Sequence, residues 1–425
     1  MSALKLNEYE KPIRTHYEIL LMCWAGWVFD FYDLILYSFL LIPIGKELNL
    51  TSVESGWVFG ASLAATALGG GLFGFLADKY GRKKVLEWTI LLFSLGTFLS
   101  GFAVDLWTLI LFRALTGFGV GGEWATGQTY IGETFPPKVR ARYAAFMQSG
   151  APVGFAIAAI VGGLVAPEIG WRACFYISIL PALLVVFVRK RIPESDIWQE
   201  RKDFLNKLPK ENKEPQVNFW ILFSSQYRYL FIISLFLAIF DMAAYWITFS
   251  WLPGYLYTER SFSLAKSAFW VIVAQVGAFL GNLAFGWTAD KFGRRPAYTI
   301  FSFLMAIGLI MITLMWSAIV AYPALILSFM FLVGFGTGMF AGYGPLFAEL
   351  YPTSIRNTAM GSAYNFARGI QFLAPVLVAV TAQYYGLSGG ISLAAIFAIL
   401  SGLWIWLFPE TRGLKIRAMP EKTYS

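Results

Sequence analysis

Charged side chains interrupt several stretches of this sequence that are otherwise strongly apolar. An ionised group at the centre of a bilayer costs about 2.5–3.5 kcal/mol even on the most lenient scale, so such residues are rare and usually functional. Two carboxylates close together in a poorly hydrated cleft do not both ionise near neutral pH, so one of them can take up and release a proton. We expect chemistry of this kind among six residues: Asp30, Asp33, Arg113, Glu123, Asp241 and Arg368.

The acidic residues are the candidates for proton coupling. Asp30 and Asp33 are three residues apart, so on a helix they share one face. This spacing favours a proton-coupling site, and the alternative is that one of the two neutralises Arg113 in a buried ion pair. The two roles are compatible. For Arg113 itself, a role in substrate binding or proton coupling and a purely structural ion pair are both open. Glu123, which lies among small residues, and Asp241 are further candidates.

A second chemical pattern lies between residues 358 and 383. A guanidinium forms bidentate hydrogen bonds with a planar carboxylate. In this region an arginine is flanked at intervals of three by two amides, and a tyrosine precedes it by four residues. The pattern predicts a clamp for an anionic substrate, and the alternative is a structural ion pair with Asp241 or Asp33. The predicted substrate-binding residues, together with Arg113, are Tyr364, Asn365, Arg368 and Gln371.

Long apolar runs must position these residues, because the chain is 58% hydrophobic and only 14% charged, whereas soluble domains contain about 25% charged residues. A run of about 20 apolar residues crosses the ~30 Å hydrocarbon layer as a helix. Both cysteines lie inside such runs, so no disulfide framework is indicated. The N-terminus shows no small-residue cleavage site and hence no removable signal peptide. We predict twelve spans: 18–42, 56–77, 85–103, 106–130, 143–166, 171–189, 229–253, 266–289, 297–319, 322–347, 358–383 and 389–408.

The chain repeats itself. The segment Gly70–Lys84, GGLFGFLADKYGRKK, returns as Asn282–Arg295, NLAFGWTADKFGRR, and Glu133-Thr-Phe-Pro…Arg140 returns as Glu349-Leu-Tyr-Pro…Arg356. Two matches in the same order indicate that the chain consists of two copies of one structural repeat. We therefore expect halves at 1–189 and 229–425, divided by a hydrophilic linker at 190–228. The repeat places Asp241 one position from the equivalent of Asp30, in the opposing wall.

The repeated segment has a definite loop chemistry. Gly70 and Gly74 are four residues apart, so they share a helix face and allow another helix to approach closely. Gly81 can adopt the left-handed conformation of a sharp turn, and the Asp78 carboxylate can bond the start of a neighbouring helix. The expected gating motif comprises Gly74, Asp78, Gly81 and Arg82 with their counterparts Gly286, Asp290, Gly293 and Arg294.

The distribution of positive charge predicts the orientation. Of the 33 lysines and arginines, the segments on one side hold only Lys46, Arg172, Arg260 and Lys266. Because cytoplasmic loops carry the excess of these residues, both termini should be cytoplasmic in a multi-pass protein of the cell membrane. The net charge of +8 therefore reflects topology and does not indicate a nucleic-acid partner.

The doubled motif GxxxG-xxx-D-[KR]-[YF]-G-R-[KR] resembles the major facilitator superfamily of transporters over essentially the whole chain. The resemblance implies an all-α membrane protein with twelve helices in two pseudo-symmetric six-helix bundles, working by alternating access. Within the superfamily, the chain resembles the sialate/carboxylate:proton symporter branch, which is related to aromatic-acid:proton symporters. The segments that carry this resemblance, with the charged pairs above, are Gly121-Gly-Glu123-Trp, Gly170-Trp-Arg172, Pro193-Glu-Ser and Trp251-Leu-Pro253. The fungal lactate-permease pattern with its histidine is missing from 229–253.

The resemblance implies proton-driven uptake of an organic carboxylate such as a monocarboxylate, sialic acid or an aromatic acid. The expected partners are that acid and the lipid bilayer, the proton is the only coupling ion, no other cofactor or metal is expected, and the chain should be a monomer. The alternative is a sugar or neutral-metabolite carrier or a drug exporter, although Gly150-Ala-Pro152-Val-Gly154 falls short of the exporter motif. An enzyme is disfavoured, because the sequence shows no metal cluster and no nucleophile paired with a base.

Overall fold

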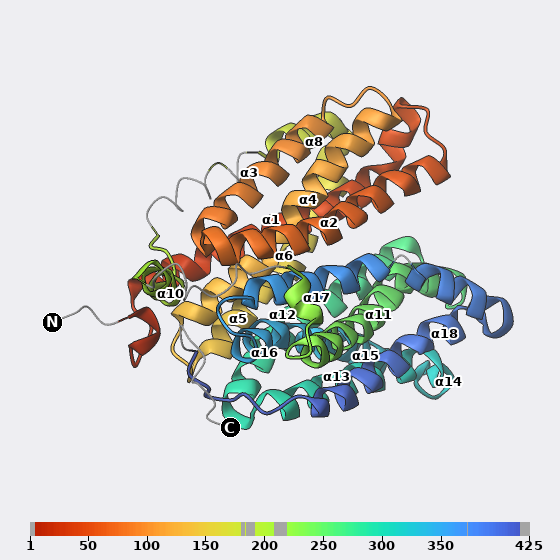
Figure 1. The fold of residues 1–425 in the computed structure, drawn as a ribbon. Helices are drawn as coiled ribbons and strands as arrows, with labels where there is room; N and C mark the ends of the chain where they lie inside the picture. Colours follow the sequence, from red (N-terminus) through yellow and green to blue (C-terminus); the bar gives the residue numbers. More distant parts are fainter. Residues whose placement is uncertain (1–4, 180–182, 184–191, 208–218, 372, 417–425) are drawn as a thin grey trace.

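The computed structural model describes residues 5–179, 183, 192–207, 219–371 and 373–416 (Figure 1). Helices make up two bundles, and no strand occurs among these residues. The first bundle contains α1 (Arg14–Glu47), α2 (Ser52–Tyr80), α3 (Arg82–Ser100), α4 (Leu106–Thr134), α5 (Arg140–Gln148), α6 (Gly150–Ile160), η2 (Val161–Val165), α7 (Ala166–Ile169) and α8 (Trp171–Ile177). The second contains α11 (Arg228–Thr258), α12 (Leu264–Phe292), α13 (Arg294–Thr313), α14 (Trp316–Ile319), α15 (Pro323–Gly336), η5 (Thr337–Gly342), α16 (Tyr343–Leu350), α17 (Arg356–Ile370), α18 (Leu373–Trp404) and η6 (Ile405–Leu407).

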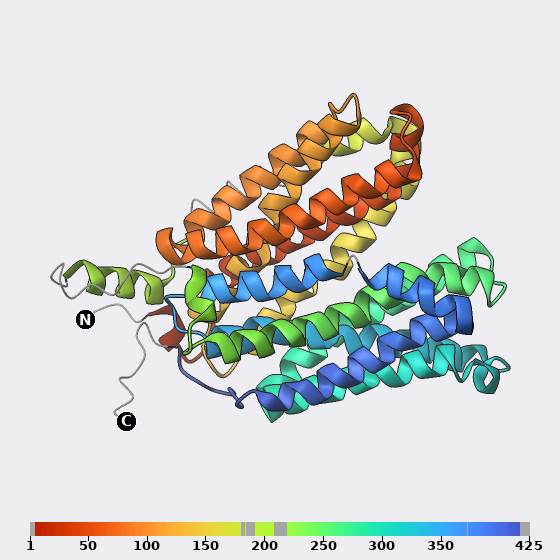
Figure 2. The same cartoon turned by 45° about the vertical axis from the view of Figure 1, so that its right-hand side comes forward.

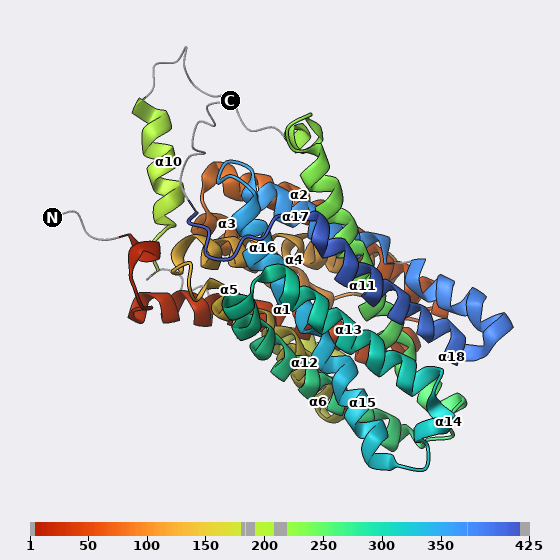
Figure 3. The same ribbon diagram turned by 90° about the horizontal axis from the view of Figure 1, so that it is seen from below.

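Short elements lie outside the bundles. They are η1 (Leu6–Glu8), the linker helix α10 (Asp196–Lys207) and η4 (Phe219–Phe223). Helix α10 lies at the end of the molecule where both chain ends are found (Figures 1 and 3). We call this the linker end, and the opposite end the far end.

The expected spans appear in order, with differences where the backbone bends. Eight helices within the described residues are long and apolar enough to cross a membrane. The last two expected spans are redistributed, because α17 stops at Ile370 and α18 runs on through Gly386, whose φ of 68° turns the chain between two helical parts. Most of the sixth span beyond residue 179, and residues 190–191 and 208–218 of the expected linker, lie outside the described residues.

Glycines in the fourth and tenth spans allow the same close packing in both bundles. A Cβ atom added to Gly117 of α4 would lie 2.2 Å from the Ser62 carbonyl oxygen of α2. One added to Gly334 of α15 would lie 1.7 Å from the Ala274 carbonyl oxygen of α12. Both distances are far below van der Waals contact, so only glycine permits these helix pairs to touch. The halves thus share a packing mode as well as a sequence pattern.

Two pseudo-symmetric helix pairs join the bundles: α2 packs on α17, and α5 packs on α12. The expected close approach at the Gly70/Gly74 face is present, since a Cβ at Gly74 would lie 2.6 Å from the Asn357 carbonyl oxygen of α17. The two bundles lie close together at the linker end and diverge toward the far end (Figure 2).

Candidate functional site

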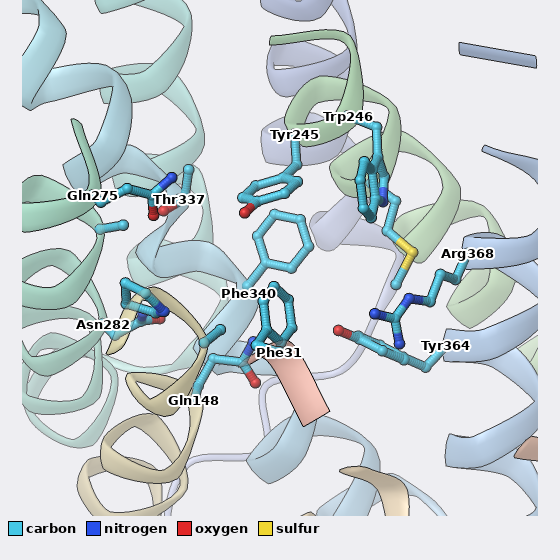
Figure 4. A pocket seen from close by; sticks show the side chains of 14 residues that line it. Phe31, Gln148, Tyr245, Trp246, Gln275, Asn282, Thr337, Phe340, Tyr364 and Arg368 are labelled. Carbon is cyan, nitrogen blue, oxygen red and sulfur yellow. The ribbon is translucent and has the colours of Figure 1, made fainter. Parts of the chain in front are cut away.

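A pocket lies between the two halves (Figure 4). Its walls come from α1, α5 and α6 on one side and from α11, α12, η5 and α17 on the other. Of the 14 side chains that line it, only Arg368 is charged. Aromatic rings and amide side chains make up most of the remainder. A single cation in an otherwise neutral, ring-lined pocket is suited to bind one anionic group.

Arg368 projects into this pocket from the last turn of α17. The side chain is only 4% exposed, and its guanidinium lies 5.8 Å from the ring centroid of Phe31. Tyr364, one turn earlier, lies beside it and stacks on Trp124 with ring centroids 3.8 Å apart. The ion pairs found among the described residues do not include Arg368. Its guanidinium is therefore available to a ligand carboxylate.

The pocket is reached from the far end. A second, outer space shares Tyr245, Trp246 and Arg368 with the first. Gln371, the amide that follows Arg368 by one turn, lines this outer space and donates from Nε2 to the Ala367 carbonyl oxygen at 3.1 Å. Arg368 thus lies where an outer vestibule narrows into the inner pocket, and the structure is open toward the far end.

The linker end is closed by the repeated loop motif. The Asp78 carboxylate of the first half accepts hydrogen bonds from the Thr358 backbone N–H at 2.8 Å, from the Thr358 hydroxyl at 2.7 Å and from the Asn357 N–H at 3.2 Å. These groups form the first turn of α17 in the second half. An acidic side chain at a helix N-terminus is favourable because its charge meets the unpaired N–H groups there. Asp78 therefore makes the contact that its position in the motif predicts.

The second copy of the motif mirrors this contact. The Asp290 carboxylate accepts from the backbone N–H groups of Ala141 at 3.2 Å and Arg142 at 3.1 Å, in the first turn of α5. Each half therefore caps a helix of the other. Gly81 and Gly293 have φ of 110° and 111°, which is the backbone turn that brings the motif arginines back toward these carboxylates.

Crossed ion pairs reinforce the closure. The Glu133 carboxylate is held by Arg82 of its own half, at 2.8 Å and 3.0 Å, and also by Arg356 of the other half. In the mirrored cluster, Glu349 is held by Arg294 of its own half at 2.8 Å and by Arg140 of the first half at 3.0 Å. All of these side chains are buried. We call the two aspartate caps and the two crossed pairs the linker-end network.

Two further glutamates support this network. Glu194 accepts from the N–H groups of Arg82 and Lys83 at the start of α3, at 3.0 Å and 3.2 Å. Glu410 does the same at the start of α13. Burial raises the pKa of the Glu194 carboxyl, against the effect of these N–H groups. The sequence analysis missed both residues, although Pro193-Glu-Ser and Pro409-Glu-Thr carry a readable repeat.

Asp33 and Arg113 form a buried ion pair away from the pocket. The Arg113 guanidinium donates to both Asp33 carboxylate oxygens, at 3.0 Å and 2.9 Å. The Thr97 hydroxyl of α3 donates to the same carboxylate at 2.7 Å. The pairing alternative for Asp33 is therefore realised within the first half. Arg113, expected among the substrate-binding residues, does not line the pocket in this conformation, because Asp33 holds its guanidinium.

The other expected residues are dispersed. Asp30 is buried on α1. Asp241 faces the interior of the second half, where it accepts from the Ser401 hydroxyl, and its neighbour Met242 lines the pocket instead. Glu123 accepts from the Thr89 hydroxyl at 3.0 Å inside the first half.

The structure corrects the position expected for Asn365. Its Nδ2 donates to the Gly121 carbonyl oxygen across the interface at 2.9 Å, so the amide points away from the pocket. Residues three apart on a helix differ in direction by about 60°. That difference is enough to place Arg368 in the pocket and Asn365 at the contact between α17 and α4.

The pocket also contains neutral polar residues that the sequence analysis missed. Gln148, Gln275 and Asn282 line it, together with Trp246 and Phe340. The amides are polar residues within apolar runs, and Gln275 and Asn282 are seven residues apart on one helix face. That spacing was a usable signal, but attention to charged residues alone passes over it.

A family model described as Major Facilitator Superfamily matches residues 22–278 and 234–422. The chain belongs to this superfamily. A probable 4-methylmuconolactone transporter from Cupriavidus pinatubonensis is 32% identical over 405 residues, covering 94% of this chain and 92% of the relative. The sialic acid transporter NanX of Escherichia coli is 32% identical over 392 residues, covering 91% and 92%. A solved structure of the proton:xylose symporter XylE superposes with a TM-score of 0.77 at 19% identity, covering 94% of this chain and 97% of the other.

Membership of the major facilitator superfamily confirms the predicted fold class and the function class. The chain is a multi-pass, all-helical membrane protein and a transporter, not an enzyme. The likeness to XylE concerns the fold alone, given the low identity. The pocket at Arg368 lies at the interface of the two halves, where transporters built from repeats bind their substrates.

Proposed function

We propose that this chain imports a small organic carboxylate together with protons, and that the carboxylate binds to Arg368. The observation that carries the proposal is the placement of Arg368 as the only charged side chain lining the inner pocket among the described residues. A bidentate contact between guanidinium and carboxylate in this low-dielectric setting supplies both affinity and orientation. The names of the two relatives above, transporters of a muconolactone and of sialic acid, agree with an acidic substrate.

Orientation follows from the charge distribution. We place the linker end in the cytoplasm, with both termini, because the lysine- and arginine-rich segments lie there. The far end then faces the outside of the cell membrane, and the structure corresponds to the outward-facing state of a monomer. In this state substrate enters through the outer vestibule and reaches Arg368 past Trp246 and Tyr245.

The proton site of the proposal is the Asp33–Arg113 pair. Protonation of Asp33 removes the negative charge that pairs with the Arg113 guanidinium. The contact between α1 and α4 is then weaker. Asp30, buried on α1 one turn before Asp33, remains a second candidate. One pH unit across the membrane supplies about 1.4 kcal/mol per proton, so an electroneutral one-to-one cycle accumulates substrate about tenfold per unit.

Inward opening requires the linker-end network to separate. When the halves part, Glu133 keeps Arg82 and Glu349 keeps Arg294, because these partners belong to the same half. Arg356 and Arg140 lose a carboxylate, as does the half-exposed Arg142, which pairs with Asp290 at 3.6 Å, and the widening cytoplasmic cavity hydrates them. Breaking a buried ion pair costs much free energy when one charge stays buried without a partner or water. The arginine partners within each half reduce this cost for the two glutamates.

Uptake into proteoliposomes tests the proposal directly. A panel of labelled carboxylates, with neutral sugars as the comparison class, is supplied with and without an inward proton gradient. We expect carboxylate uptake that rises with the gradient, and competition by unlabelled carboxylates only. Uptake of a neutral sugar that free carboxylates do not inhibit contradicts the proposal and favours the neutral-metabolite alternative.

A further inference from the structure

Two amide side chains of α12 face the pocket from the wall opposite Arg368. Figure 4 shows Gln275 and Asn282 on one side, Arg368 and Tyr364 on the other. Gln275 and Asn282 are seven residues apart, which is close to two helical turns and keeps both on one face of α12. They therefore form a single polar surface, which we call the amide wall.

The amide wall has hydrogen-bonding atoms without partners in the protein. Gln275 and Asn282 are 8% and 4% exposed. Asn282 Oδ1 and Gln275 Nε2 have no partner in hydrogen-bond geometry, although the Tyr245 hydroxyl is a polar neighbour of the Gln275 amide. A buried polar group left unsatisfied costs about 1–3 kcal/mol, so such groups in a native protein require an explanation. Both residues line the pocket, so water or a ligand can satisfy these atoms there. One is a donor and the other an acceptor, in the assigned amide orientation.

The space between the two polar ends is apolar. The rings of Phe31 and Phe340 lie between Arg368 and the amide wall in Figure 4. None of the described residues that line the amide-wall side carries a positive charge. A second carboxylate placed there would meet the Asn282 carbonyl oxygen with no cation to neutralise it. A hydroxyl group, in contrast, can accept from Gln275 and donate to Asn282.

We propose that the amide wall is a second subsite that binds an uncharged hydrogen-bonding group at the far end of the substrate. The favoured substrate then has a carboxylate at one end, an apolar and preferably flat body, and a hydroxyl or carbonyl group at the other end. This inference rests on the proposed binding of a carboxylate to Arg368, and it adds the residues that select among carboxylates. A site built to hydrogen-bond a hydroxyl group discriminates strongly against an analogue that lacks it.

Equilibrium binding of four probes to the purified full-length protein tests the subsite. The probes are benzoate, 3-hydroxybenzoate, 4-hydroxybenzoate and terephthalate, and the readout is ligand-induced thermal stabilisation as a function of concentration. We expect one hydroxybenzoate to bind at least about tenfold more tightly than benzoate, and terephthalate to bind more weakly than that hydroxybenzoate. The variants Gln275→Met and Asn282→Leu keep side-chain volume but lose the hydrogen bonds. In each of them, the affinities for benzoate and for that hydroxybenzoate should differ by no more than about twofold.

Controls separate the subsite from the proposed function. The affinity for benzoate should change little in both variants, and this binding also shows that the variants are folded. The control variant Ser267→Ala changes a buried polar residue of α12 outside the pocket and should keep the full preference for the hydroxybenzoate. Failure of all four probes to bind overturns the subsite, whereas the carboxylate function fails only if no carboxylate of the uptake panel is transported. Equal binding of benzoate and the hydroxybenzoates, an unchanged preference in the variants, or tightest binding of terephthalate overturns the subsite alone.

Discussion

Asp33 pairs with Arg113 and not with Arg368. The Arg113 guanidinium contacts both Asp33 oxygens, at 3.0 Å and 2.9 Å, between α4 and α1 of the same half. Arg368 of the other half lines the pocket instead, beside Tyr364. The two buried arginines therefore have different electrostatic situations, one neutralised by a protein carboxylate and the other facing open space. In the proposed mechanism, the Asp33–Arg113 pair is therefore the proton site and Arg368 is the substrate site.

Replacing Asp33 with Asn should uncouple transport from the proton gradient. An amide stays neutral at all pH values, so the variant cannot carry a proton through the cycle. We expect pH-driven accumulation to be lost while exchange of labelled for unlabelled substrate continues. Both are measured in proteoliposomes, with Asp105→Asn, at the exposed N-cap of α4, as the control that keeps accumulation. Accumulation at the wild-type level in Asp33→Asn rejects the coupling role.

Loss of Asp33 also leaves Arg113 buried without its partner, which is strongly destabilising in general. The double variant Asp33→Asn/Arg113→Gln removes that charge as well. We expect it to recover much of the thermal stability lost in the single variant but none of the accumulation. Recovery of accumulation in the double variant is the result that assigns the pair to structure alone.

Replacing Arg368 with Lys should weaken carboxylate binding by about tenfold or more. A lysine keeps the charge but offers a point donor in place of the planar fork. Hydrogen bonds to charged groups contribute about 1.5–3 kcal/mol, so Arg368→Gln should lose still more affinity. Thermal stabilisation by benzoate measures the dissociation constants, and Lys266→Gln, outside both pockets, is the matched cation control. Wild-type affinity in Arg368→Lys excludes a bidentate clamp.

Asp78→Ala should shift the protein toward the inward-facing state. The substitution removes three hydrogen bonds to the start of α17, which are made only while the linker end is closed. The Thr126 hydroxyl accepts from Asn357 Nδ2 across the interface at 3.1 Å. A reporter cysteine at this position is therefore reached by reagents only when the halves part. In a background with Cys23 and Cys174 replaced by Ser, we expect faster maleimide labelling of Thr126→Cys in Asp78→Ala.

The far end supplies the control for this shift. A cysteine at Ser250, in the wall of the outer vestibule, should be labelled readily in the parent protein and more slowly in Asp78→Ala. Alternating access requires the two labelling rates to change in opposite directions. Asp290→Ala should act in the same way through α5. A rise in labelling at both positions indicates general loosening and contradicts a switch between two states.

The repeat made much of this architecture predictable. Asp78 was expected to bond a neighbouring helix because its position follows a close-packed glycine face, and it does. The sequence could not tell which partners Glu133 and Arg140 of the repeated segment would contact. Each residue pairs with the other half, with Arg356 and Glu349 respectively, and such pairing depends on how two folded bundles dock.

The pocket was only partly predictable, for a physical reason. Charge inside an apolar run is a strong signal, and it pointed to Arg368, which lines the pocket. It pointed equally to Asp33 and Arg113, which pair inside the first half, and to Asp30, Glu123 and Asp241, which do not line the pocket. Hydrogen-bonding amides such as Gln275 cost less to bury than charges, so their presence in an apolar run carries less information. The rotation of a helix about its axis, which sends Asn365 and Arg368 into different surroundings, is set by packing between the halves.

The turn at Gly81 gives a stability prediction with an internal control. Its φ of 110° and ψ of 155° belong to a region that only glycine occupies readily, and an added Cβ would lie 2.3 Å from Glu194 Oε2. Gly81→Ala should therefore lower the free energy of unfolding by about 1–3 kcal/mol. Gly60→Ala, in the helical interior of α2 with nothing within 4 Å of the added atom, should be neutral or stabilising by up to ~1 kcal/mol. Thermal unfolding in detergent compares the two, and equal stability of both variants is the outcome that contradicts strain at Gly81.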